Sequence, residues 1–144
     1  MKSVSHTVVS LVVAGLALAL TDPPFAAPVV VAVVLVFGVL IDVDHFVLAA
    51  RRTGGLEAVR RCLRDPRIVF VEQEAIFEDG EVGMLERLLS HVVIGGVAVP
   101  LCWLLYGPYL GQLVGAAVYA HVLADLVADT RNAVVLESDD PRLN

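Results

Sequence analysis

An uncharged apolar segment constrains the fold of this chain more than any other feature of its sequence. Residues 25–41 read FAAPVVVAVVLVFGVLI and contain no charged side chain. With the turns that flank it, this segment reaches the roughly 20 residues that a helix needs to cross a bilayer. Hydrophobic residues make up 58% of the chain and its mean hydropathy is +0.79, which is high for a soluble domain. The sequence therefore predicts an integral membrane protein.

Three further segments are similarly apolar, and chain-breaking residues separate them. We predict four membrane spans, at about 3–20, 25–48, 85–106 and 109–129. TDPP at 21–24 ends the first span, and GP at 107–108 turns the chain tightly between the last two. The predicted fold is all-α: a four-helix membrane bundle that forms one domain over residues 1–144, with a short tail at 131–144.

The distribution of positive charge predicts the orientation of these spans. Seven of the ten basic residues lie between residues 51 and 90, and the connections at 21–24 and 107–108 have none. Because basic residues mark the cytoplasmic side, we expect the loop at about 51–84 and both termini in the cytoplasm, with both hairpins outside. The protein would then lie in the inner (cytoplasmic) membrane. Alternatively, the first span is a cleaved signal peptide.

The cytoplasmic loop is predicted to contain a short amphipathic helix. GLEAVRRCLR, at 55–64, places Leu56, Val59 and Leu63 at helical spacing, with arginines on the other face. Such a helix either lies on anionic lipid headgroups, which we favour, or is solvated. The net charge of −6 argues against a nucleic-acid partner, since phosphate binding needs a basic surface.

Ionisable side chains lie near the cytoplasmic end of each predicted span. At the helical rise of 1.5 Å per residue, His6, Asp42, His91 and His121 lie about 16–22 Å from the outer ends of their spans. The full set consists of His6, Asp42, Asp44, His45, His91, His121 and Asp125. Asp42 and His45 share one helical face, and His121 and Asp125 share another. Asp44 lies off the first face, where it either points toward a neighbouring helix or acts as a partner that orients a ligand.

These residue types at one depth predict a site for a divalent metal. A carboxylate at mid-membrane costs roughly 2.5–3.5 kcal/mol, and convergence on a cation would offset that cost. Imidazole and carboxylate groups are ligands of divalent transition metals, with zinc the first expectation and other transition metals as alternatives. One zinc uses three or four ligands, so either two metals bind, or some of the seven side chains orient the ligating imidazoles.

The same residues resemble a known family, the membrane-bound metal-dependent hydrolases of the YdjM type in bacteria and archaea. The counterparts of the family motifs are SHT at 5–7, IDVDH at 41–45, ERLLSHV at 86–92 and HVLAD at 121–125. They follow the family's order over nearly the whole chain. Ile41 replaces the family's proline, Glu86 its first histidine and Leu88 its glycine, while Ser90 stands for the threonine.

The resemblance implies hydrolysis by a metal-bound hydroxide. The implied metal ligands are His6, Asp42, His45, His91, His121 and Asp125. In that scheme Asp44 or Glu86 accepts a proton, and Arg87 with Arg51 holds an anionic substrate. The Asp…His and His-x-x-x-Asp elements also resemble zinc-dependent phospholipases of the phospholipase C kind. A site at headgroup level then favours an ester or phosphoester in a membrane lipid or lipid-linked substrate.

Two other classes of function remain open from the sequence. Carboxylates and histidines inside spans also mark cation or proton transporters, but transport needs polar groups along the whole path. The outer halves of the predicted spans offer only Gln112 as a strongly polar residue. The second alternative is a non-catalytic, metal-stabilised membrane module that recruits a partner or senses lipid, which the substitutions at Glu86 and Leu88 favour.

Overall fold

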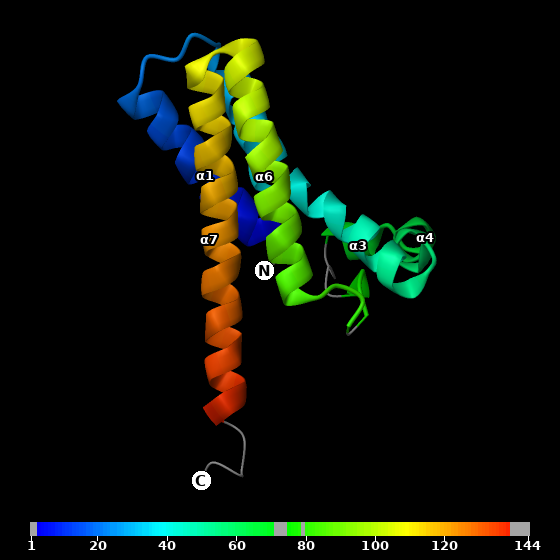
Figure 1. Ribbon diagram of the computed structural model, residues 1–144. Helices are drawn as coiled ribbons and strands as arrows, with labels where there is room; N and C mark the ends of the chain where they lie inside the picture. Colours follow the sequence, from blue (N-terminus) through cyan, green and yellow to red (C-terminus); the bar gives the residue numbers. More distant parts are fainter. Residues whose placement is uncertain (1–2, 71–74, 79, 139–144) are drawn as a thin grey trace.

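The computed structural model describes residues 3–70, 75–78 and 80–138, and every regular element within them is helical. The elements follow in the order α1 (Ser3–Leu20), α2 (Ala27–Gly38), η1 (Leu40–Val43), α3 (Asp44–Thr53), α4 (Glu57–Arg64), α5 (Arg67–Phe70), α6 (Met84–Tyr106) and α7 (Pro108–Ser138). The α1–α2 connection and the α6–α7 turn lie at the same end of the molecule (Figure 1). This prediction of an all-helical chain is confirmed for the described residues.

Two of the helices are long and apolar enough to cross a membrane. They are α6, over Met84–Tyr106, and α7, over Pro108–Asn132; α2 and α3 together form a third such span if the bent pair is counted as one. The first helix is apolar but shorter, over Val4–Leu20. Large apolar side chains on the outer face of α6, such as Leu101 and Leu104, are exposed, as lipid contact requires. These features indicate a membrane protein.

The span predicted at 25–48 is not one continuous helix. α2 ends at Gly38, a 3₁₀ turn follows, and the two parts meet at an angle of 41°. At the break the amide of Asp42 donates to the carbonyl of Val39, three residues back, at 3.4 Å. The carbonyl of Gly38, to which that amide would donate in an unbroken α-helix, is thereby released for another partner.

The last helix is longer than the predicted span. α7 continues to Ser138, through residues that the sequence assigned to a tail at 131–144, while residues 139–144 lie outside the described part of the chain. The prediction ended the span at the charged residues near Asp129. A helix need not end at the membrane surface, and the chain after Asp129 has no glycine or proline before Pro141 to end it.

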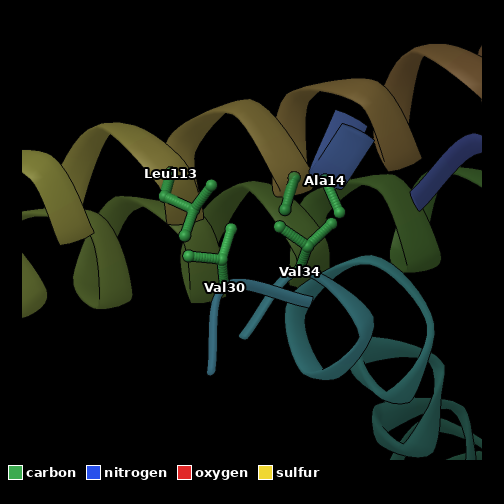
Figure 2. Close-up of a cluster of buried hydrophobic side chains, with 5 residues drawn as sticks. Ala14, Val30, Val34 and Leu113 are labelled. Carbon is green, nitrogen blue, oxygen red and sulfur yellow. The ribbon is translucent and has the colours of Figure 1, made fainter. Parts of the chain in front are cut away.

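Small side chains let the long helices approach closely. Figure 2 shows Ala14 of α1, Val30 and Val34 of α2 and Leu113 of α7 pointing toward one another in a buried cluster. Gly95 of α6 lies against Val118 of α7, where an added Cβ would come within 2.9 Å of the valine Cγ1. The α6–α7 turn needs Gly107, whose φ of 96° is unfavourable for other residues. Close approach at Gly95 and the turn at Gly107 thus define the α6–α7 hairpin, and the buried cluster packs α1 and α2 against α7.

The segment that follows the break projects sideways from the long helices as α3 and α4 (Figure 1). The predicted helix at 55–64 is observed as Glu57–Arg64, with Leu56 and Leu63 exposed. Arg61 of α4 holds the following segment in place. Its Nε donates to the carbonyl of Ile76 at 2.9 Å, and its guanidinium pairs with Glu78 and Glu81.

Candidate metal centre

Four histidines and three aspartates lie together where the long helices meet the break. His6 comes from α1, Asp42 from η1, Asp44 and His45 from α3, His91 from α6, and His121 and Asp125 from α7. The three histidines of the long helices, His6, His91 and His121, are each only 1% exposed. All seven residues singled out from the sequence therefore belong to one cluster.

The carboxylate of Asp42 is at the centre of this cluster. Its Oδ1 lies 3.3 Å from His121 Nε2, 3.4 Å from His45 Nε2 and 3.6 Å from His91 Nε2. Its Oδ2 lies 3.8 Å from His6 Nε2. Imidazole nitrogens from four helices, α1, α3, α6 and α7, thus lie close to one carboxylate.

Asp125 forms a second point of convergence. Its Oδ1 lies 3.2 Å from His6 Nε2, and its Oδ2 lies 3.5 Å from His121 Nε2. The i, i+4 spacing of His121 and Asp125 places both on the face of α7 that meets α1. The sequence pattern predicted this shared face.

The donor set and its spacing fit a transition metal. Two ligand atoms about 2.1 Å from one zinc at a tetrahedral angle are about 3.4 Å apart, close to the nitrogen–oxygen separations seen here. Asp42 Oδ1, His45 Nε2 and His121 Nε2 are buried and make no hydrogen bond within the described structure. Buried polar atoms normally have hydrogen-bond partners, so atoms that instead converge without bonding are typical of ligands. This buried His/Asp group could hold a metal ion.

The break between α2 and η1 orients one of the imidazoles. The Nδ1 of His121 donates to the released carbonyl of Gly38 at 2.9 Å. This bond fixes the ring and its tautomer, so that Nε2 faces the carboxylates as an acceptor. Gly38 also lies against Ser10 of α1, whose Oγ would be 2.2 Å from an added Cβ. The irregular backbone therefore has a function in the site that the apolar sequence around it did not indicate.

Asp44 is held beside the cluster by the neighbouring helix. Ser90 of α6 donates from its Oγ to Asp44 Oδ2 at 2.5 Å. The other oxygen, Oδ1, lies 3.3 Å from His91 Nε2 and 3.6 Å from His45 Nε2. Ser90 was noted in the sequence only as a substitute for threonine, and its contact with Asp44 could not be found from spacing.

Arg87 lies at the border of the site and is paired with acidic side chains. Its Nε is 3.6 Å from Asp125 Oδ2, and its Nη2 donates to Asp129. Asp129 is the last residue of the span predicted at 109–129. The two helices instead bring it to Arg87, which fixes the arginine next to a carboxylate of the cluster. A small cavity of about 70 Å³ between α6 and α7 is lined by Arg87, His91 and Asp125 among others.

Glu86 and Arg51 lie outside the cluster. Glu86 is exposed, and its carboxylate accepts from Arg52 Nη1 at 3.0 Å rather than facing the site's histidines. Glu86 and His91 are five positions apart in α6, which turns the two side chains about 140° apart around the helix. Arg51 is also exposed and lines, with Glu86, an open groove of about 520 Å³ between α3 and α6. The remaining residues lining this groove are Leu48, Arg52, Leu89, Ser90 and Val93.

One aromatic residue of the loop also reaches the site. Phe77 lies edge-on to the imidazole of His45, with 6.0 Å between ring centroids, and 5.1 Å from the ring of Phe46. The contacts of Arg61 with residues near Phe77 hold it there. The sequence offered no signal for this cover, because it depends on how the loop folds back.

We compared the chain with family models, curated proteins and solved structures, and none matches it.

Proposed function

We propose that this protein is a membrane-embedded, metal-dependent hydrolase that acts at the cytoplasmic face on a phosphoester or ester of a lipid or lipid-linked molecule. In this proposal it belongs with the YdjM-type hydrolases, its α1, α2–α3, α6 and α7 segments are four spans, and zinc is the metal. The observation that carries the proposal is the convergence of imidazole and carboxylate atoms from separate helices on Asp42.

The donor set supports this chemistry. Mixed imidazole and carboxylate ligands suit zinc, and a bound divalent metal activates water for attack at neutral pH. Asp44 is the side chain best situated to accept a proton, since Ser90 orients its Oδ2 while its Oδ1 stays beside His45 and His91. Glu86, the other proton acceptor that the resemblance suggested, is occupied by Arg52 on the exposed side of α6. We therefore assign the proton to Asp44.

The groove between α3 and α6 supports a lipid substrate. Leu48, Leu89 and Val93 give it apolar walls, and Arg51 adds positive charge, while Arg52 pairs with Glu86 on the same lining. An amphipathic groove of this kind matches an anionic headgroup attached to an acyl chain. Ser90 lines the groove and also contacts Asp44, so the groove leads to the proposed proton acceptor. Arg87 would act in positioning, because Asp125 and Asp129 already pair with it.

Turnover on lipid vesicles tests this function. The protein, purified in detergent and reconstituted, is incubated with vesicles of phosphatidic acid and phosphatidylglycerol, and the released phosphate or headgroup is measured with and without a chelator. We expect release that the chelator abolishes and that His121→Ala lacks. Gln112→Ala is the matched control, because Gln112 is an exposed polar residue of the same helix. Metal-loaded protein that releases nothing from either lipid, or from soluble esters, would contradict the hydrolase proposal.

A non-catalytic role is the second candidate, and one observation favours it. The ligands come from α1, α6, α7 and the break, so a bound metal would tie these segments together and stabilise the fold. In that case metal removal lowers the unfolding temperature while no lipid or ester is hydrolysed. A transporter would instead move its cation into sealed vesicles, which the same reconstituted protein can report.

A further inference from the structure

We infer that the site holds two metal ions that share the carboxylate of Asp42, one fully enclosed by protein ligands and the other with an open coordination position. The inference rests on the proposed metal-dependent function and specifies the centre that would carry it. It chooses between the two interpretations that the sequence left open, two metals or one metal with orienting partners.

The ligand atoms divide into two groups that overlap at one residue. The first group is His6, Asp42, His121 and Asp125, and the second is Asp42, His45 and His91. Within each group the ligand atoms lie within 4.8 Å of one another. A single zinc takes at most about four such ligands, so one ion cannot use both groups. Two ions can, provided that Asp42 is common to both.

The stacking of the imidazoles follows the same division. His6 and His121 are stacked with ring centroids 4.0 Å apart, and His45 and His91 are stacked at 5.3 Å. Each pair directs its Nε2 atoms toward Asp42, whose Oδ1 faces His121, His45 and His91 and whose Oδ2 faces His6. Because Asp42 contacts imidazoles of both pairs, it is the residue that could serve an ion in each group.

The two groups differ in ligand number and in burial. The first has four protein ligands; apart from the shared Asp42, which is 20% exposed, its side chains His6, His121 and Asp125 are 1%, 0% and 6% exposed. The second has three protein ligands, and His45 is 13% exposed. Structural zinc sites are closed by four protein ligands, whereas catalytic sites keep one position for water or substrate. The second group therefore forms the open position.

Asp44 lies on the side of the open group. It belongs to neither group of mutually close ligand atoms, yet its Oδ1 is near both His45 and His91. The hydrogen bond from Ser90 and the Phe77 ring beside His45 shape this side of the site. A water entering the open position would meet Asp44, which is where a proton acceptor is needed.

Metal stoichiometry after equilibrium dialysis against excess Zn²⁺ tests the shared centre. We expect about two equivalents in the wild type, about one in His45→Ala and in His6→Ala, and none in Asp42→Ala, because that carboxylate serves both ions. Gln112→Ala is the matched control, since Gln112 is an exposed residue of α7 outside both ligand groups, and it should keep both ions. One equivalent in the wild type, or loss of both ions from His45→Ala, would overturn the inference.

A second measurement does not depend on variants that must fold. Wild-type protein loaded with Mn²⁺ should give the electron paramagnetic resonance spectrum of two spin-coupled ions, as a shared carboxylate requires; a spectrum of isolated Mn²⁺ at full loading would overturn the inference. Two coupled ions without lipid hydrolysis would contradict the proposed function but support the shared centre. Hydrolysis by protein that binds only one ion would contradict the shared centre but support the proposed function.

Discussion

Two adjacent glycines of α6 allow the dependence of the site on helix packing to be measured. Gly95 faces Val118 of α7, and a Cβ at Gly95 would lie 2.9 Å from Val118 Cγ1, whereas a Cβ at Gly96 would meet nothing within 4 Å. Gly95 is one helical turn from His91, and Val118 is one turn from His121. A change in the helix separation at this contact should therefore displace the ligands His91 and His121.

The size of the effect follows from the contact. Ordinary contacts of a Cβ begin at 3.4 Å, so Gly95→Ala requires a shift of about 0.5 Å at the α6–α7 contact, which we expect the helices to take up by moving apart. Metal–ligand distances tolerate only about 0.2 Å, so metal affinity should fall by about 10–100-fold. Overpacking should also cost about 1–3 kcal/mol relative to Gly96→Ala. Both substitutions gain the same helix propensity, about 1 kcal/mol, which cancels in the comparison.

Competition with a chromophoric chelator measures the affinity, and thermal unfolding in detergent measures the stability. We expect Gly96→Ala to bind metal as the wild type does and to unfold at the same or a higher temperature. If Gly95→Ala matched Gly96→Ala in both measurements, the claim that this contact sets the distance between His91 and His121 would be refuted.

Two further predictions concern the proton acceptor and the orientation of the chain. Ser90→Ala should leave the metal content unchanged but lower kcat by about 10–100-fold, because Asp44 loses a hydrogen bond to a charged group that is worth about 1.5–3 kcal/mol; Ser90→Thr should restore the rate, and an equal loss in Ser90→Thr would contradict the assignment. Cys62 of α4 should react with a membrane-impermeant maleimide only from the cytoplasmic side in oriented vesicles, with Cys62→Ser as the control for labelling at Cys102; labelling from the opposite side would reverse the predicted orientation.

The helices and the ligand residues could be predicted from the sequence because both depend on local pattern. An uncharged segment such as 25–41 indicates a membrane helix through its length alone. His121 and Asp125 share a face because of helical periodicity, which holds in any α-helix. Depth along the spans then placed the ionisable side chains at one level, where the structure has them in contact.

The break after Gly38 could not be predicted in the same way. The residues around it, Phe37 to Ile41, are uniformly apolar, so hydropathy does not change where the helix ends. What distinguishes the position is tertiary: Ser10 of α1 needs the space that Gly38 leaves, and His121 needs its carbonyl. Neither partner is near Gly38 in the sequence.

The position of Glu86 shows the limit of reasoning from motif alignment. It stands where the family that this sequence resembles has a histidine, and that position suggested a role in the site. The direction of a side chain around a helix depends on its register, and α6 directs Arg87 and His91 inward while Glu86 faces Arg52. The loop cover by Phe77 was out of reach for a related reason, since the ion pairs of Arg61 that hold it join residues 17 and 20 positions apart.

The distribution of ligands along the chain has a consequence for biosynthesis. His6 emerges from the ribosome first, whereas His121 and Asp125 lie on the last helix described, after every other ligand has been synthesised. A nascent chain halted before that helix could supply all of the second group, Asp42, His45 and His91, but only His6 and Asp42 of the first. Loading of an ion into the first group would therefore come only after the α6–α7 hairpin has entered the bilayer, as a late maturation step.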